Sequence, residues 1–183
     1  MLIVLTLSSL LFIAVRTFKF VLKPFRWKSI ANIPLFAGDL LLLVLIVFQL
    51  LNPDFGKMPM PQSIEAQLSL AGLVLAVLGS IFASWARIYM GSTWRTAWDV
   101  RGQNKLVTGG PWKFCRHPIY AGSWLFGVGF ELALGNWLVF GAIALLIVIV
   151  KIARKEEAYL EARFGDHWRQ YAKDTPDIIP GIH

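Results

Sequence analysis

Residues 66–90 read AQLSLAGLVLAVLGSIFASWARIYM, and this stretch decides the fold class. Arg87 is its one charged residue, and it stands close to the end of the stretch. An α-helix needs about 20 mostly apolar residues to cross the hydrocarbon core of a bilayer. The stretch therefore predicts a membrane-spanning helix.

Four further apolar stretches have the same character, and they cover residues 1–22, 34–51, 118–134 and 137–153. The last two are separated only by Gly135 and Asn136, which predicts a tight helical hairpin. We expect the first stretch to be a retained span, because Arg16 and Lys19 follow its apolar run and a signal peptide has its basic residues before it. The sequence thus predicts an all-α integral membrane protein with about five transmembrane helices.

The composition supports this class. Of the 183 residues, 56% are hydrophobic and only 16% are charged, whereas a soluble domain carries roughly 25% charged residues. Ordinary soluble domains, disordered chains and collagen-like repeats are therefore excluded. A single cysteine, Cys115, rules out an internal disulfide and a multi-cysteine metal site. We expect no metal.

The orientation of the chain in the membrane follows from the distribution of its basic residues. With five spans, Lys57 is the only one of the 18 lysines and arginines that falls on the other side from the rest. Basic residues gather on the cytosolic side of membrane proteins. The N-terminus is therefore predicted outside and the C-terminus in the cytosol, across a bacterial or archaeal inner membrane or an endoplasmic reticulum membrane. The net charge of +7 reflects this topology, and we expect no nucleic-acid partner.

Small residues mark a packing face on the stretch 66–90. They recur every four positions as Gly72, Ala76, Ser80 and Ser84. Such a stripe lets another helix approach closely. In the stretch 118–134, three glycines indicate either close packing or room for a ligand, and these are Gly122, Gly127 and Gly129.

The spans contain few ionisable residues. Asp39 stands near the cytosolic start of 34–51, and Glu131 stands near the outer end of 118–134. A transporter or channel would place such groups near the middle of a span. We interpret both residues as structural, and we see no polar path across the membrane.

Polar and charged residues concentrate instead in two segments that we expect in the cytosol, 91–117 and 151–179. In the first, Pro118 suits the first turn of the following helix and disfavours a helical conformation at His117. Arg116 and His117 therefore precede a helix N-terminus, where backbone N–H groups and the helix dipole favour an anion. We expect a ligand carboxylate or phosphate there.

The second segment extends the fifth span into the cytosol. One of its faces is apolar apart from a carboxylate, and it consists of Ile149, Ala153, Glu156, Leu160 and Phe164. Glu156 is thus predicted to point towards the bundle, with Glu157 at the border of that face. Its partner would be Arg116, or the ammonium or ribose hydroxyls of a ligand. The tail after Phe164-Gly165 is expected to fold back over the site.

These two segments resemble the isoprenylcysteine carboxyl methyltransferase family, and the related phospholipid N-methyltransferases share the outline of the pattern. The resemblance rests on LVTGGPW at 106–112, RHPIYAG at 116–122, Glu156-Glu157, Phe164-Gly165, Trp168, Tyr171 and Pro180. It covers roughly the C-terminal half of the chain. The chain thereby divides into N-terminal helices, residues 1–65, and a methyltransferase core, residues 66–183.

The resemblance implies an integral membrane methyltransferase. It would take S-adenosylmethionine from the cytosol, release S-adenosylhomocysteine, and methylate a lipophilic acceptor from the bilayer. By position, the cofactor pocket would contain Asn104, Lys105, Leu106, Val107, Trp112, His117, Pro118, Ile119, Tyr120, Glu156 and Glu157. The catalytic residues would be Arg116, His117 and Glu156, and Arg154 and Tyr171 would contact the substrate. Trp112 stands where the family usually has tyrosine.

Methyl transfer from a sulfonium is an in-line displacement that depends on alignment and on exclusion of water. A carboxylate acceptor needs no general base, whereas an amine or thiol would have to lose a proton, and His117 is placed to take it. The acceptor stays open among a prenylated cysteine carboxylate, a phospholipid amine, a quinone-like or sterol-like lipid, and a small thiol or phenol. The alternative functions are an NADPH-dependent membrane reductase of the sterol reductase type and a non-enzymatic scaffold or transporter.

Overall fold

The computed structural model describes residues 1–22, 33–91 and 105–179, with the backbone alone described over 16–22 and 33–39. Its elements in chain order are α1 (Leu2–Leu22), α2 (Ile33–Leu51), α3 (Gln62–Met90), the 3₁₀ turn η4 (Gly110–Lys113), α4 (Pro118–Ala133), α5 (Leu138–Phe164) and α6 (Asp166–Asp174). The described part of the chain contains no β-strand beyond one isolated bridge. The all-α prediction is therefore confirmed for that part, and the predicted apolar stretches all lie on helices.

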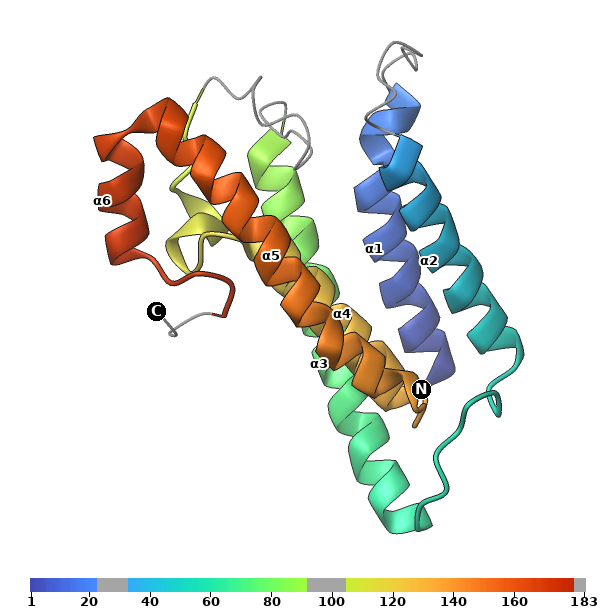
Figure 1. Cartoon of the computed structure of the whole chain (residues 1–183). Coiled ribbons are helices and arrows are strands. Elements are labelled where there is room, and N and C mark those ends of the chain that lie inside the picture. Colours follow the sequence, from blue (N-terminus) through green and yellow to red (C-terminus); the bar gives the residue numbers. More distant parts are fainter. Residues whose placement is uncertain (23–32, 92–104, 180–183) are drawn as a thin grey trace.

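The helices form a bundle in which α3 contacts both α1 and α4, and α5 packs against α4 (Figure 1). Helices α1 and α3 end at the same end of the bundle at which α4 begins and α5 terminates. The turn η4 and the helix α6 lie at this end too. The two polar segments therefore meet there, as the charge pattern predicts.

Glycines bring α3 and α4 into backbone contact. A Cβ atom on Gly72 or Gly79 would meet the backbone of α4, and one on Gly122 or Gly129 would meet that of α3. The expected close approach of a second helix is confirmed, and two of the three glycines of α4 serve packing. A Cβ atom on Gly127 would meet no other atom within 4 Å.

The predicted small-residue stripe serves two neighbours. While the glycines of α3 face α4, the hydroxyl of Ser80 donates to the carbonyl of Ser8 on α1 at 2.9 Å. One turn further along α1, the ring of Phe12 stacks on that of Phe126, with 4.4 Å between centroids. A repeat of four residues drifts slowly around a helix of 3.6 residues per turn, so the stripe passes from one neighbour to the next.

The connection between α4 and α5 is held by one amide. The Nδ2 of Asn136 donates to the carbonyl of Phe55 at 2.6 Å, and its Oδ1 accepts from the N–H of Leu138 at 2.9 Å. Nearby, Gln49 of α2 donates its Nε2 to Glu131 at 2.8 Å. The predicted hairpin is present, and Glu131 bonds between helices at the end of the bundle opposite the polar segments.

Among the described residues, α3 is the one helix that is both long and apolar enough to cross a membrane. Two shorter apolar segments lie in α1 and α2, over Leu2–Val15 and Leu40–Leu51. Many large apolar side chains of these helices are exposed, among them Ile3, Leu41 and Ile88. This surface is consistent with membrane character, and the count of five spans stays a prediction. The side chain of Asp39 lies outside the described residues.

Candidate active site at the start of α4

The site forms where the chain enters α4. His117 is the N-terminal cap residue, with φ −126° and ψ 58°, and Pro118 occupies the first helical position. This backbone conformation is not helical, which agrees with the disfavoured α region of a residue that precedes proline. The boundary predicted from the sequence is therefore confirmed, and the side chains of Arg116 and His117 reach Glu157 in the C-terminal part of α5.

Arg116 ties three segments together. Its Nε donates to Glu157 Oε1 at 2.7 Å, and its Nη1 donates to the carbonyls of Ala172 and Thr175, each at 2.8 Å. These bonds use most of the donors of a guanidinium, which has five. The sequence led us to expect a ligand carboxylate at Arg116, and the structure places protein acceptors there instead.

Glu157 lies at the centre of this network. Its Oε1 also accepts from His117 Nε2 at 3.1 Å, and its Oε2 accepts from Arg154 Nη1 at 3.1 Å. Burial alone would raise the pKa of Glu157, but the hydrogen bonds from His117 and Arg116 outweigh it and lower the pKa to about 2. Glu157 is therefore a firmly ionised structural group. It occupies the place beside Arg116 that the sequence analysis gave to Glu156.

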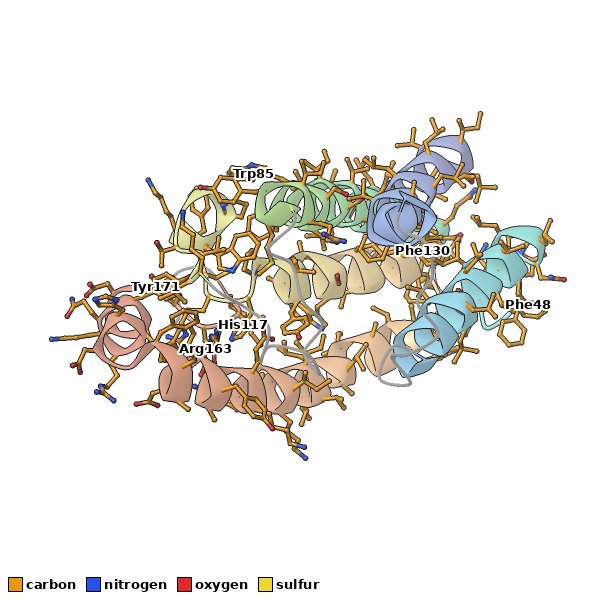
Figure 2. The ribbon with its side chains drawn as sticks, turned by 90° about the horizontal axis from the view of Figure 1, so that it is seen from above. Phe48, Trp85, His117, Phe130, Arg163 and Tyr171 are labelled. Carbon is orange, nitrogen blue, oxygen red and sulfur yellow. The ribbon has the colours of Figure 1, made fainter. Side chains whose placement is uncertain are left out.

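Glu156 has a different partner. Its Oε2 accepts from the hydroxyl of Tyr120 at 2.9 Å, and the ring of Tyr120 stacks on that of His117 with centroids 5.5 Å apart. No described residue bonds its second oxygen, Oε1. Figure 2 shows His117 between α4 and α5. Glu156 is thus oriented by Tyr120.

The C-terminal segment folds back onto the site, as expected. The N–H of Arg116 donates to the carbonyls of Pro176 and Asp177 at 2.8 and 2.9 Å. The hydroxyl of Tyr171 donates to the carbonyl of Trp112 at 2.8 Å, which joins α6 to η4. Burial raises the pKa of Tyr171, so its phenol stays protonated as this bond requires. Tyr171, expected to contact substrate, holds the tail in place.

Asp177 belongs to the site although the sequence analysis did not select it. Its Oδ2 lies 2.8 Å from Arg154 Nη2, and its Oδ1 lies 3.8 Å from His117 Nε2. A lone acid in a tail that follows a proline gives no periodic signal, so only the fold could reveal its place. It completes a layer of two carboxylates and two guanidiniums over the start of α4.

His117, Glu157 and Asp177 have ligand atoms within 4.8 Å of one another, close enough to hold a metal ion. Both carboxylates, however, already pair with arginine. A divalent cation would have to displace those guanidiniums, and it would meet their charge at close range. We interpret the cluster as an ion-pair network, and the expected absence of a metal stays a prediction.

The remaining predicted cofactor residues lie around this layer. Trp112 is buried, and its ring lies 6.2 Å from that of Tyr89. Leu106 and Val107 are half-buried, whereas Lys105 is exposed. Asn104 and Pro180 lie outside the described residues. The structure therefore gathers Trp112, Tyr120 and the two glutamates at one end of the bundle without assigning them a ligand.

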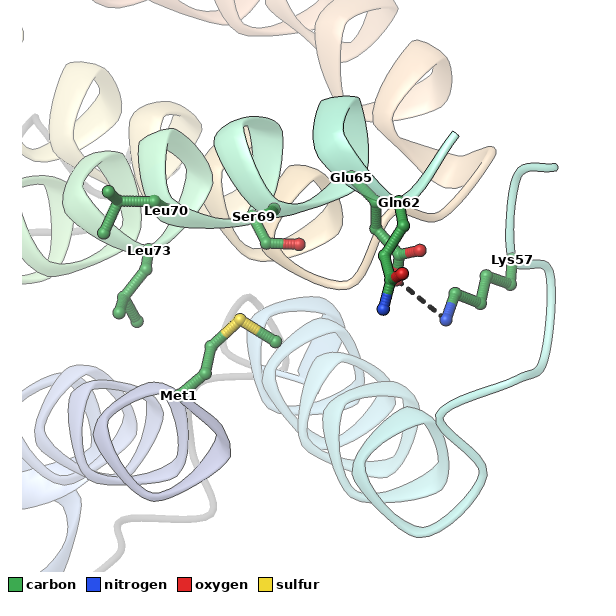
Figure 3. Close-up of a pocket in the computed structure, with 8 residues that line it drawn as sticks. Met1, Lys57, Gln62, Glu65, Ser69, Leu70 and Leu73 are labelled. Carbon is green, nitrogen blue, oxygen red and sulfur yellow. Dashed lines mark ion pairs between the residues drawn. The ribbon is translucent and has the colours of Figure 1, made fainter. Parts of the chain in front are cut away.

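A separate cavity lies at the opposite end of the bundle (Figure 3). It has a volume of about 600 Å³ and opens between the start of α1 and the start of α3. Lys57 and Glu65 form an ion pair of 2.8 Å on its wall, and Leu70 and Leu73 line its apolar part. None of the predicted site residues lines this cavity, so it is separate from the candidate active site.

The sequence model of the phospholipid methyltransferase family matches residues 68–167. The chain belongs to this family. The match runs from α3 through η4 and α4 to the first residues of α6, and it includes Tyr120, Glu156 and Glu157. The class predicted from the sequence, a methyltransferase, is thereby confirmed at the level of the family.

Individual relatives support the predicted resemblance. The chain is 31% identical over 118 residues to protein-S-isoprenylcysteine O-methyltransferase B of Arabidopsis thaliana, which covers 61% of this chain and 59% of the relative. It is 39% identical over 80 residues to protein-S-isoprenylcysteine O-methyltransferase of Schizosaccharomyces pombe, which covers 42% and 34%. The similarity to isoprenylcysteine methyltransferases is confirmed. The chain spans less than two thirds of these relatives.

A reductase is also similar to the chain. A probable 7-dehydrocholesterol reductase of Acanthamoeba polyphaga mimivirus is 28% identical over 99 residues, which covers 52% of this chain and 22% of the relative. The reductase type named above as an alternative function is therefore represented among the relatives of the chain. It covers a small part of that protein, and the family match favours methyl transfer.

Proposed function

We infer that the chain transfers a methyl group from S-adenosylmethionine to a lipophilic acceptor at the cytosolic face of a membrane. The observation that carries this inference is the match of residues 68–167 to a methyltransferase family, over the segments that meet at the start of α4. The names of the relatives favour a prenylated cysteine carboxylate as the acceptor. Five spans, with the N-terminus outside and the C-terminus in the cytosol, belong to the same proposal.

The donor set fits the cofactor. Glu156 Oε1 has no partner among the described residues, and a carboxylate oxygen accepts hydrogen bonds from an ammonium group or from ribose hydroxyls. The buried ring of Trp112 supplies an apolar wall. We therefore assign Glu156, Tyr120 and Trp112 to cofactor binding. The cofactor itself supplies an activated methyl on a sulfonium.

The other residues of the site keep the reacting groups aligned. Arg116, Glu157 and Asp177 fix the C-terminal segment against the start of α4, and this covering excludes water from the site. His117 donates its Nε2 proton to ionised Glu157, which sets the orientation of the ring. For a carboxylate acceptor no proton has to be removed. In this proposal Arg116 and Glu157 are positioning residues rather than catalytic ones.

NADPH is the ligand of the alternative function. A 2′-phosphate needs an arginine, and the described site has Arg116 and Arg154 already paired with Glu157 and Asp177. This pairing favours a cofactor without that phosphate. The acceptor, whether a cysteine carboxylate or a phospholipid amine, is decided by assay.

The test compares ligand binding to the full chain in detergent. We expect S-adenosylhomocysteine to bind and NADPH not to bind. Glu156→Gln should weaken S-adenosylhomocysteine binding about tenfold, because it removes a charged acceptor. Glu161→Gln is the matched control, since Glu161 stands on the same helix and is exposed. Binding of NADPH alone, or equal binding by both variants, would contradict the proposal. Transfer of labelled methyl to N-acetyl-S-farnesylcysteine then identifies the acceptor.

A further inference from the structure

A small cavity lies between α1, α3 and α4, at the end of the bundle that carries the candidate active site. Its volume is about 20 Å³, which is room for one water molecule or one ligand oxygen. Helix α1 supplies Phe12 and Val15, α4 supplies Ile119 and Ser123, and α3 supplies Ala83, Ser84 and Arg87. Among the described residues that line it, none is acidic.

The hydroxyl of Ser84 is buried in this cavity without a hydrogen-bond partner among the described residues. Its side chain is 7% exposed, and its Oγ has no hydrogen-bond partner within the described structure. Other helical hydroxyls donate to a carbonyl four residues earlier, as those of Thr6, Ser9 and Ser123 do. A buried hydroxyl without a partner is costly. A ligand atom in the cavity would satisfy it.

The charge of the surroundings determines the kind of ligand. Arg87 lies one turn after Ser84 on the same face of α3, and its side chain is 6% exposed. Ile119 belongs to the first turn of α4, where the helix dipole favours negative charge. A cation, a hydroxyl donor and a helix N-terminus therefore converge on a cavity whose described lining residues include no acid. This combination suits an oxyanion.

The apolar side chains determine what carries the oxyanion. Phe12, Val15 and Ile119 line the cavity, and α1 and α3 expose large apolar residues such as Leu10 and Ile88. The hydrocarbon chain of a lipid can pack against such apolar surfaces, because contact between apolar groups is favourable. We propose that the cavity binds the oxyanion head of a lipid, a carboxylate or a phosphate oxygen, with Ser84 donating its hydroxyl and Arg87 supplying the charge. This site is independent of the cofactor site, and it stands whether or not the chain transfers a methyl group.

Binding without any methyl donor tests the site, so the result does not depend on the proposed function. The full chain in neutral detergent is titrated with N-acetyl-S-farnesylcysteine and with its methyl ester. In parallel, its thermal stability is measured in nanodiscs of phosphatidylcholine with and without phosphatidylglycerol. We expect Ser84→Ala to weaken binding of an anionic lipid about tenfold, since it removes a hydrogen bond to a charged group. Binding of the neutral ester should not change.

The variants keep the outcomes distinct. Ser84→Ala removes a hydroxyl without a partner, so it should fold even where Arg87→Gln does not. Ser9→Ala is the control, because Ser9 is a buried helical serine whose hydroxyl bonds to Leu5. A Ser84→Ala effect on the farnesylcysteine acid assigns the site to an acceptor carboxylate, and an effect on phosphatidylglycerol assigns it to a membrane lipid. If Ser84→Ala binds both as the wild type does, the proposal is wrong.

Discussion

Arg116 Nε lies 2.7 Å from Glu157 Oε1, and this ion pair joins the segment just before α4 to the C-terminal part of α5. The same guanidinium holds the carbonyls of Ala172 and Thr175. One side chain thus connects three segments that are distant in the sequence. The planar fork of arginine makes this possible, since its donors leave in fixed and divergent directions.

Replacement of Arg116 by lysine should destabilise the protein. An ammonium group can keep the charge beside Glu157, but it cannot bond both carbonyls in the same geometry. We expect the free energy of unfolding to fall by about 2 kcal/mol, and the C-terminal segment to become sensitive to protease. Unfolding in detergent and limited proteolysis measure the two effects. Arg169→Lys, at an exposed ion pair, should change stability by less than about 0.5 kcal/mol; equal losses would contradict the assigned role of Arg116.

The network should also make stability depend on pH. The pKa of Glu157 is lowered to about 2, below the value of about 4.3 that is usual in an unfolded chain. A group of this kind stabilises the fold above its unfolded pKa, and the stabilisation is lost as pH falls towards the folded one. We expect stability to decline between about pH 5 and pH 2.

Glu157→Gln isolates this effect. The variant should be less stable at pH 6 and should lose less stability than the wild type on acidification, because it has no carboxylate to protonate at that position. Unfolding midpoints at a series of pH values measure the difference. Glu161→Gln, at an exposed position of the same helix, should follow the wild type, and a parallel decline in Glu157→Gln would assign the acid sensitivity to other groups.

The hairpin amide gives a third prediction. Asn136 is 2% exposed and bonds both Phe55 and Leu138. Asn136→Ala should lower the free energy of unfolding by about 2 kcal/mol, since it removes both hydrogen bonds of a buried side-chain amide. Asn52→Ala is the comparison, because Asn52 is exposed and its side chain bonds the carbonyl of Phe48 one turn earlier. Thermal unfolding of the two variants should differ clearly, and similar midpoints would show that the Asn136 bonds contribute little.

Local patterns sufficed to predict much of the fold. Long apolar stretches gave the helices, and Pro118 gave the start of α4, because both signals act within a few residues. The small-residue stripe predicted close packing, but it did not reveal that Gly79 faces α4 while Ser80 bonds α1. That division depends on the positions of two other helices.

The site was harder to predict for a similar reason. Glu156 and Glu157 are adjacent, and periodicity placed Glu156 towards the bundle and Glu157 at the border. In the structure both bond residues at or near the start of α4: Glu156 bonds Tyr120 of α4, and Glu157 bonds Arg116, which precedes it. Helix periodicity gives the face of a residue, whereas its partner depends on how far the side chain reaches and on the segments that fold back. Asp177 entered the site only through such a segment.

Glycine substitutions test the α3–α4 contact directly. An alanine at Gly129 would place its Cβ against the backbone of Gly72 and Ala76, which cannot move aside as a flexible side chain can. We expect Gly129→Ala to destabilise the protein by about 1–3 kcal/mol. Gly127→Ala, on the same helix, meets no atom within 4 Å and should be neutral or stabilising by up to about 1 kcal/mol, because alanine favours the helix over glycine. Unfolding of the two variants in detergent checks the prediction. If Gly129→Ala unfolds like Gly127→Ala, the two helices do not meet through their glycines.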